Sequence, residues 1–146
     1  MLSATLLCLV VGISDGDTLT ARCGQPGAYE QIKVRLSAID APESKQPFGN
    51  RSRQHLADLC FQQQAKIKVL NVDRYKRKVA DVECRGRDAG QEQVQAGMAW
   101  VYTQYAKNYP HLIPIERKAR SERRGLWAEA KPIAPWEWRN SSRLRY

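Results

Sequence analysis

Short segments rich in apolar and β-branched residues fill the first half of the chain, a pattern typical of β-strands. Turn residues separate the first three segments, with Asp15-Gly16-Asp17 after the first and residues 24–27 after the second. A later pair of segments alternates apolar and polar positions on both sides of residues 73–77. The pattern predicts five strands, at residues 5–13, 18–23, 31–39, 65–72 and 78–84.

Apolar residues spaced three or four positions apart predict about three helices. Residues 48–59 place Leu56 and Leu59 among polar neighbours, and residues 91–99 place Val94 and Met98 on one face. The third helix is expected at residues 113–124, where Gly125 ends it. Five strands with flanking helices predict an α+β fold, a Greek-key barrel of the OB type, which often binds oligonucleotides.

A length of 146 residues fits one domain, which we place at residues 1–139, followed by a tail at residues 140–146. The segment 131–146 carries Pro132, Pro135, Trp136, Trp138 and three arginines. We expect it to be irregular and to have no catalytic role, with its tryptophans anchoring it to the domain surface. Stacking on nucleic-acid bases is the alternative role for these rings.

Composition points to a folded, basic protein. Hydrophobic residues make up 42% and charged residues 27% of the chain, as in ordinary globular proteins. The 24 Lys and Arg against 15 Asp and Glu give a net charge of +9, which favours polyanionic partners such as nucleic acid. A basic surface that only confers solubility is the alternative interpretation.

The apolar start of the chain, residues 1–11, is too short for the roughly 20 residues that cross a bilayer, and no basic residue precedes it. We therefore expect no membrane association. A first strand is the favoured interpretation, because the run leads directly into a turn, and a remnant of a signal sequence is the alternative.

Four widely spaced cysteines are present: Cys8, Cys23, Cys60 and Cys84. They lack the CxxC or His-rich spacing of zinc sites and suit two disulfides. Pairing of strands about the turn at Asp15 and Gly16 brings Cys8 opposite Cys23, which leaves Cys60 for Cys84. Two disulfides indicate a secreted or periplasmic protein, whereas four reduced, buried thiols in a cytosolic protein are the alternative.

Three carboxylates lie at two separate predicted turns: Asp17 follows the first turn, and Asp40 and Glu43 flank Ala41-Pro42 at the end of the third predicted strand. Folding that brings them together would create an oxygen-rich site for a hard cation such as calcium or magnesium. Asp15 and Asp17 alone would be weak evidence, because Asp-Gly is a common turn dipeptide.

Two arginines are candidate phosphate ligands. Arg35 lies between apolar residues of a predicted strand, where a charge needs a partner, either a phosphate or a cross-strand salt bridge. Arg77 ends the run Asp73-Arg74-Tyr75-Lys76-Arg77, whose charge density alone would suggest a solvated hairpin tip.

Taken together, these motifs resemble the staphylococcal nuclease (thermonuclease) family. The resemblance covers residues 8–139 and rests on four pieces in order: Asp17-Thr18, Arg35 with Asp40-Ala41-Pro42-Glu43, Asp73-Arg74-Tyr75-Lys76-Arg77, and Gly125-Leu126-Trp127. One departure is Lys76, at a position where the family usually has a glycine. It bears on the turn that presents Arg77, because a positive φ is unfavourable for Lys.

The resemblance implies a set of site residues. Asp17, Asp40 and the backbone carbonyl of Ala41 would bind Ca²⁺, Glu43 would be the general base or orient the water, and Arg35 and Arg77 would grip the scissile phosphate. The residues expected to contact the nucleotide are Arg74, Tyr75 and Tyr105, with Tyr102 as a neighbouring alternative to Tyr105.

We therefore expect a monomeric, calcium-dependent nuclease, a hydrolase with endonuclease activity, that attacks phosphodiester bonds of DNA and RNA with water. Two alternative functions do not involve catalysis. One is a catalytically inactive OB-fold module that binds nucleic acid, and the other is a basic adaptor whose binding weakens with salt and does not need calcium.

Overall fold

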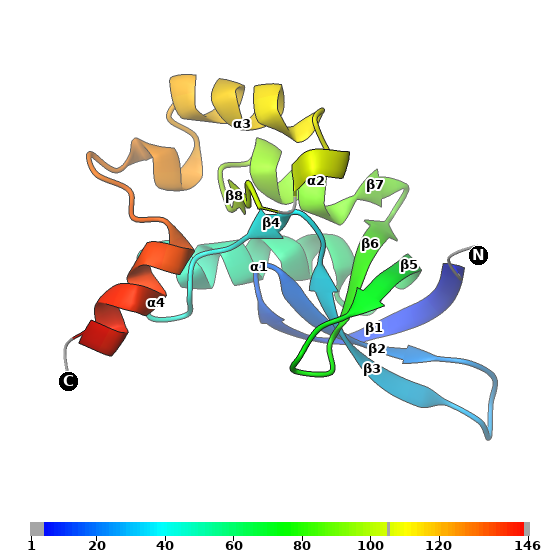
Figure 1. Ribbon diagram of the computed structural model, residues 1–146. Helices are drawn as coiled ribbons and strands as arrows, with labels where there is room; N and C mark the ends of the chain where they lie inside the picture. Colours follow the sequence, from blue (N-terminus) through cyan, green and yellow to red (C-terminus); the bar gives the residue numbers. More distant parts are fainter. Residues whose placement is uncertain (1–4, 105, 145–146) are drawn as a thin grey trace.

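The computed structural model describes residues 5–104 and 106–144, which form a closed β-barrel with the helices gathered on one side of it (Figure 1). The barrel strands are β1 (Thr5–Asp15), β2 (Thr18–Cys23), β3 (Glu30–Leu36), β5 (Gln64–Val72) and β6 (Lys78–Cys84). They pair in the order β3-β2-β1-β5-β6, and parallel pairing of β3 with β6 closes the barrel. The predicted α+β fold on a five-stranded barrel is confirmed.

Alternating burial along the strands forms the barrel core. In β5 and β6, Ala65, Ile67 and Val82 are fully or almost fully buried, whereas Lys66 and Lys68, on either side of Ile67, point to solvent. This two-residue period lets one face of each strand fill the interior while the other stays polar. The same interior receives residues from the first three strands: Val10, Leu19, Ala21, Ile32 and Val34.

Short elements connect and cover the barrel: β4 (Ile39–Asp40), β7 (Arg87–Asp88), β8 (Trp100–Val101), α1 (Gly49–Cys60), α2 (Ala89–Gln95), α3 (Leu112–Ser121) and the 3-10 turns η1 (Ala106–Asn108) and η2 (Gly125–Ala128). α1 buries Leu56 and Cys60 in the main core. No helix among the described residues combines the length and apolar character needed to cross a membrane.

The third predicted strand, residues 31–39, is divided in the structure. Ala38 has a φ of 66°, a left-handed conformation that ends the extended run after Leu36. The chain then turns, and Ile39 and Asp40 form β4, which pairs with Val101 and Trp100 of β8. The prediction of one continuous strand was wrong at this point, and the break is what carries Asp40 away from the barrel wall.

The predicted second helix is shorter and begins earlier. The Asp88 side chain accepts a hydrogen bond from the Gln91 backbone N–H at 2.8 Å, so α2 starts at Ala89 rather than at Gln91. Gly97, with a φ of 71°, ends the helical stretch, and its Cα faces the Arg124 carbonyl too closely for a side chain. The segment after Gly97 is therefore free to form β8.

The C-terminal segment is a helix, α4 (Pro135–Leu144), and not the irregular tail that the sequence suggested. Proline suits the first helical turn because its missing N–H has no partner there. The Ala134 carbonyl then accepts hydrogen bonds from the backbone of Glu137 and Trp138. α4 runs through the boundary that we placed at residue 139, so residues 140–144 continue the same helix.

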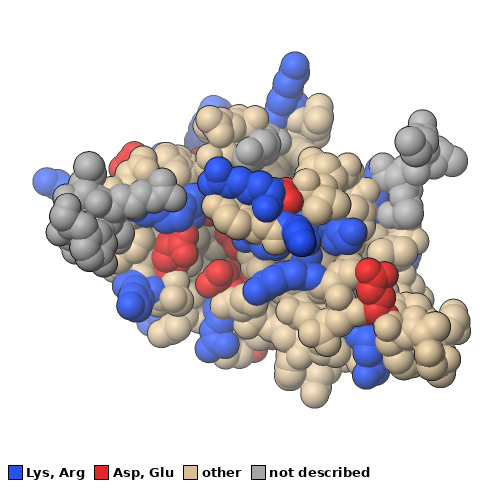
Figure 2. All heavy atoms as spheres, turned by 60° about the horizontal axis from the view of Figure 1, so that its bottom comes forward, with Lys and Arg blue, Asp and Glu red and all other residues tan. Residues whose placement is uncertain are grey.

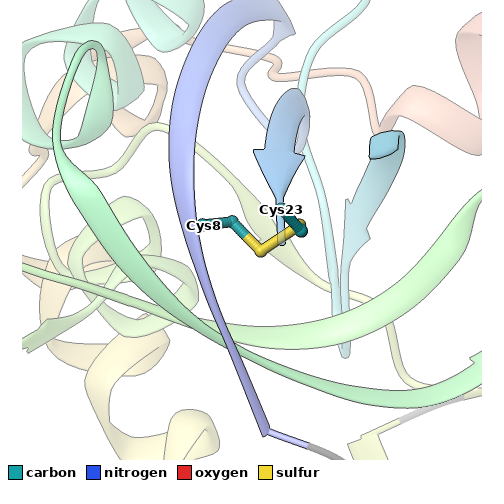
Figure 3. The surroundings of a disulfide bond; sticks show 2 residues. All are labelled: Cys8 and Cys23. Atoms are coloured by element: carbon teal, nitrogen blue, oxygen red, sulfur yellow. A yellow bond between two sulfur atoms is a disulfide. The ribbon is translucent and has the colours of Figure 1, made fainter. Parts of the chain in front are cut away.

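Two disulfides confirm the predicted pairing of the cysteines. Cys8 and Cys23 are direct partners in the β1–β2 ladder with Cα atoms 4.4 Å apart, and Figure 3 shows the bridge between these strands. Cys60 at the end of α1 bridges to Cys84 at the end of β6, with Cα atoms 5.4 Å apart. Both separations lie in the usual range for disulfides.

The second bridge is expected to contribute strongly to stability. It joins residues 24 apart, and loss of that constraint on the unfolded chain is worth roughly 3 kcal/mol. The variant with both Cys60 and Cys84 replaced by alanine should therefore melt about 10 °C lower, as measured by calorimetry. An unchanged melting temperature in the double variant, with the intact bridge verified by mass spectrometry in the parent, would contradict this expectation.

Candidate active site

A cleft of about 510 Å³ opens where the β1–β2 turn, the segment after β4, the β5–β6 hairpin and α4 meet. Figure 2 shows a face of the molecule on which Lys and Arg atoms surround Asp and Glu atoms near the middle. The cleft is lined by Asp15, Asp17, Lys33, Arg35, Asp40, Ala41, Glu43, Arg74, Tyr75, Arg77 and Arg139. Eight of the nine predicted site residues are in this set; their roles stay predictions.

Asp17 is fixed by hydrogen bonds on both carboxylate oxygens. Oδ1 accepts from the Thr18 hydroxyl and Oδ2 from the Ala41 backbone N–H, each at 2.8 Å. The Asp17 carbonyl also accepts from the Leu36 N–H at 2.8 Å. The turn after β1 is thereby tied to the end of β3 and to the segment after β4, so two distant parts of the sequence meet at this carboxylate.

Asp40 is the most deeply buried acidic group of the cleft, with 1% of its surface exposed. Burial raises the pKa of its carboxyl, hydrogen bonds from Arg139 act in the opposite direction, and the negative charge of Asp17 adds to the increase. Ionised Asp40 therefore depends on positive charge nearby. β4 holds its backbone in place through the pairing of Asp40 with Trp100.

Glu43 lies at the rim of the same cleft. Its backbone N–H donates to the Gln46 side-chain oxygen at 3.1 Å, which fixes the turn that follows Pro42. Its Oε1 accepts a hydrogen bond from Arg139 at 2.6 Å. About a third of the Glu43 side chain is exposed, so this carboxylate faces the cleft and can reach water.

Arg35 points from β3 toward the acidic cluster of the cleft, which consists of Asp17, Asp40 and Glu43. Its Nη1 donates to the Leu36 and Ile39 carbonyls at 2.7 Å each, so backbone oxygens orient the guanidinium. The group lies 3.7 Å from Asp17 Oδ2 and 3.5 Å from Asp40 Oδ1. The ion-pair partners of this partly buried charge among the described residues are therefore carboxylates, and the cleft leaves room for an anion beside it.

Arg77 is presented by a tight turn built around Asp73. Asp73 Oδ1 accepts from the backbone N–H groups of Tyr75 and Arg77, and Oδ2 accepts from Arg77 Nε at 2.8 Å. Slight burial opposes ionisation, but the hydrogen bonds from Arg77 and Tyr75 prevail and hold the pKa of Asp73 below its usual value. Lys76 has a φ of 66°, so this position does adopt the conformation that favours glycine.

Tyr75 lies exposed at the mouth of the cleft between two arginines. Arg74 and Arg77 place their guanidinium carbons 4.9 and 5.4 Å from the ring centre, and Arg74 also donates to the Tyr75 hydroxyl at 2.8 Å. An exposed ring flanked by cations can stack on a base while the cations contact phosphate.

Of the two candidate tyrosines in the segment after β8, Tyr105 lies outside the described residues. Tyr102 lines a neighbouring cavity of about 980 Å³, together with Tyr75 and Arg139. Its backbone N–H donates to the Ala38 carbonyl at 2.8 Å. Tyr102, the alternative to Tyr105, therefore lines a cavity that adjoins the cleft and shares residues with it.

The residue that sequence reasoning missed is Arg139 of α4. Its Nη2 and Nη1 donate to the two oxygens of Asp40 at 2.8 and 3.3 Å, and Nη1 donates to Glu43 at 2.6 Å. These hydrogen bonds raise the pKa of the Arg139 guanidinium above its usual value, although burial acts against them. The one signal for it was indirect: a buried carboxylate such as Asp40 requires a cationic partner.

The donors of the cleft fit a hard cation. Its described lining residues supply carboxylates and backbone oxygens and include neither His nor Cys, a set that suits Ca²⁺ and not zinc. Across the described residues, no group of three or more His, Cys, Asp or Glu side chains is arranged to hold a metal ion. The expected ligands are two side chains, Asp17 and Asp40, and the Ala41 carbonyl, so water would complete the coordination.

Comparisons with known proteins relate this chain to nucleases. The family described as staphylococcal nuclease homologue matches residues 33–129. The chain is 42% identical over 137 residues to an uncharacterized endonuclease of Haemophilus influenzae, covering 94% of this chain and 75% of the relative. It is 41% identical over 144 residues to micrococcal nuclease of Shigella flexneri (92% and 80%) and 34% identical over 146 residues to protein ParB of Escherichia coli (93% and 80%).

Proposed function

This chain belongs to the staphylococcal nuclease homologue family, and we propose on that premise that it is a nuclease that hydrolyses phosphodiester bonds of DNA and RNA with Ca²⁺ as cofactor. The observation that carries the proposal is the cleft itself. Glu43, Asp17 and Asp40 lie in one cavity with Arg35 and Arg77, although they come from separate turns of the chain. Carboxylates beside arginines provide a base and phosphate ligands in one place.

In the proposed reaction, Glu43 orients a water molecule and accepts its proton as the oxygen attacks phosphorus. Its side chain suits this role because it is partly exposed and has its backbone fixed by Gln46. The attack breaks the bond from phosphorus to one of the two ester oxygens, which takes up a proton from solvent and leaves as a hydroxyl. Glu43 then returns its proton to solvent.

Arg35 and Arg77 bind the non-bridging oxygens of the phosphate, whose negative charge increases during attack. A guanidinium offers forked donors that match two phosphate oxygens, which a lysine cannot do. Arg35 is preoriented by the Leu36 and Ile39 carbonyls, and Arg77 by Asp73. Bound Ca²⁺ would supply further positive charge to neutralise a phosphate oxygen.

We expect cleavage to require a divalent cation, with Ca²⁺ the most effective, because Mg²⁺ demands stricter octahedral geometry. The test is incubation of the protein with supercoiled plasmid and with RNA in Ca²⁺, in Mg²⁺ and in EGTA, followed by electrophoresis. Nicking in Ca²⁺ and none in EGTA is the expected result. Equal cleavage in EGTA would contradict calcium dependence, and binding without cleavage in every buffer would favour the inactive OB-fold module.

We further propose that the protein works as a monomer in an oxidising compartment, either secreted or periplasmic. The proposed base, Glu43, and both phosphate-binding arginines, Arg35 and Arg77, already lie in one cleft of a single chain, which is what a monomeric enzyme requires. Two disulfides, Cys8–Cys23 and Cys60–Cys84, support the compartment, because cytosolic proteins rarely keep such bridges.

A further inference from the structure

Arg139 makes the shortest cationic contacts to the acidic cluster of the cleft. It lies 2.8 Å from Asp40 and 2.6 Å from Glu43, whereas Arg35 approaches Asp40 only to 3.5 Å. The guanidinium therefore bridges two carboxylates that would otherwise repel each other. Residue 139 also lies beyond the segment 33–129 that matches the family, so the family match assigns it no role.

Aromatic packing brings α4 to this position. Trp136 makes edge-on contacts with Trp100 at 5.5 Å and with Tyr102 at 5.2 Å between ring centres. Trp100 is also the β8 residue that pairs with Asp40, so the same residue positions the carboxylate and the helix that carries Arg139. Figure 1 shows α4 beside the segment that leads from β4 to α1.

Further contacts hold the segment before α4. The Gln46 amide donates to the Ile133 carbonyl, and Trp138 and Pro42 line the same small cavity of about 60 Å³. Ala134, immediately before the helix, is almost fully buried. The C-terminal segment is thus held near residues on both sides of Glu43, namely Pro42 and Gln46. The fold itself therefore places Arg139 at the site.

We propose that Arg139 is a positioning residue for the hydrolysis proposed above: it bridges Asp40 and Glu43 and so holds the Glu43 carboxylate toward the attacking water. The inference rests on the proposed function. The bridge occupies only Oε1 of Glu43, and Oε2 has no hydrogen-bond partner among the described residues, so it can accept a proton from water. Asp40 keeps acceptor capacity too, because a carboxylate has about four lone-pair sites.

The test compares kcat and KM of the wild type, Arg139→Gln and Arg139→Lys on an oligonucleotide in saturating Ca²⁺. Misplacement of a reacting group costs up to roughly 100-fold in rate, so Arg139→Gln should lower kcat by about 10- to 100-fold, with KM within about threefold. Lysine keeps the charge without the fork and should recover part of the loss. Arg117→Gln removes the same charge from an exposed position on α3 and should cleave at the wild-type rate.

A double-mutant cycle separates positioning from a general structural role. If Arg139 acts through Glu43, adding Arg139→Gln to Glu43→Gln should change kcat by less than about twofold, because no base remains to be positioned. An equal loss in both backgrounds would overturn the inference, as would a rise in KM with unchanged kcat.

Melting temperatures in EGTA verify that each variant is folded at the assay temperature. Wild-type kcat in a folded Arg139→Gln protein overturns this inference alone. If Arg139→Gln does not fold, Arg139→Lys decides. A kcat equal to that of the wild type overturns the inference. A decrease in kcat that is no longer seen when Arg139→Lys is added to Glu43→Gln supports it. An inactive wild type overturns the proposed function and this inference with it.

Discussion

Glu43→Gln is expected to lower the kcat of nucleic-acid cleavage by at least about 100-fold, the scale on which a general base contributes to catalysis. Glutamine keeps the shape of the side chain and an oxygen that can accept from Arg139, but it cannot take up a proton at neutral pH. The Glu43 backbone contact with Gln46 is unaffected. We therefore expect a folded protein that binds its substrate and cleaves it slowly.

Single-turnover rates and melting temperatures measured on the same preparation test this expectation. Glu30→Gln, which removes the same charge from an exposed position at the start of β3, is the matched control and should retain activity. If Glu43→Gln has a normal melting temperature and near-wild-type turnover, then Glu43 is not the base and the proposed mechanism loses its first step.

Arg77→Ala is expected to lower kcat by roughly 100- to 1,000-fold, the cost of removing one preoriented donor to the transition state. The fold should survive because Asp73 Oδ1 still accepts from the Tyr75 and residue 77 backbone N–H groups. The lost ion pair with Asp73 is partly exposed, so its contribution to stability is about 1 kcal/mol or less.

Two measurements isolate the role of Arg77. Arg77→Lys keeps the charge but not the fork and should fall between the wild type and the alanine variant. Substrate affinity, measured by fluorescence anisotropy in Ca²⁺ at constant ionic strength with the slowly cleaving Glu43→Gln as background, should change much less than kcat. Loss of affinity without loss of kcat would assign Arg77 to ground-state binding instead.

Local sequence signals were sufficient for the barrel and the bridges. Apolar and β-branched segments separated by turn residues located the strands, and symmetry about the turn after β1 paired Cys8 with Cys23. The same signals do not encode the left-handed conformation of Ala38, because alanine has no preference for positive φ. That conformation comes from tertiary structure, and it separates β3 from β4.

The site residues that could be predicted from the sequence are those that belong to short sequence motifs. Asp40-Ala41-Pro42-Glu43 and the run that ends at Arg77 could be recognised locally. Arg139 could not, because it reaches Asp40 across 99 residues of sequence and depends on the docking of Trp136. A pattern of prolines and tryptophans indicated anchoring to the surface but did not specify the surface on which α4 docks.

The most direct test of the proposed function is plasmid nicking by the wild type and Glu43→Gln, purified in parallel and each assayed in Ca²⁺ and in EGTA. The parallel variant excludes a contaminating nuclease, because any contaminant would accompany both preparations. We predict nicked and linear plasmid for the wild type in Ca²⁺, and intact supercoiled plasmid in the other three reactions over the same time. Intact plasmid for the wild type in Ca²⁺, or equal nicking by both proteins, would contradict a calcium-dependent nuclease that uses Glu43.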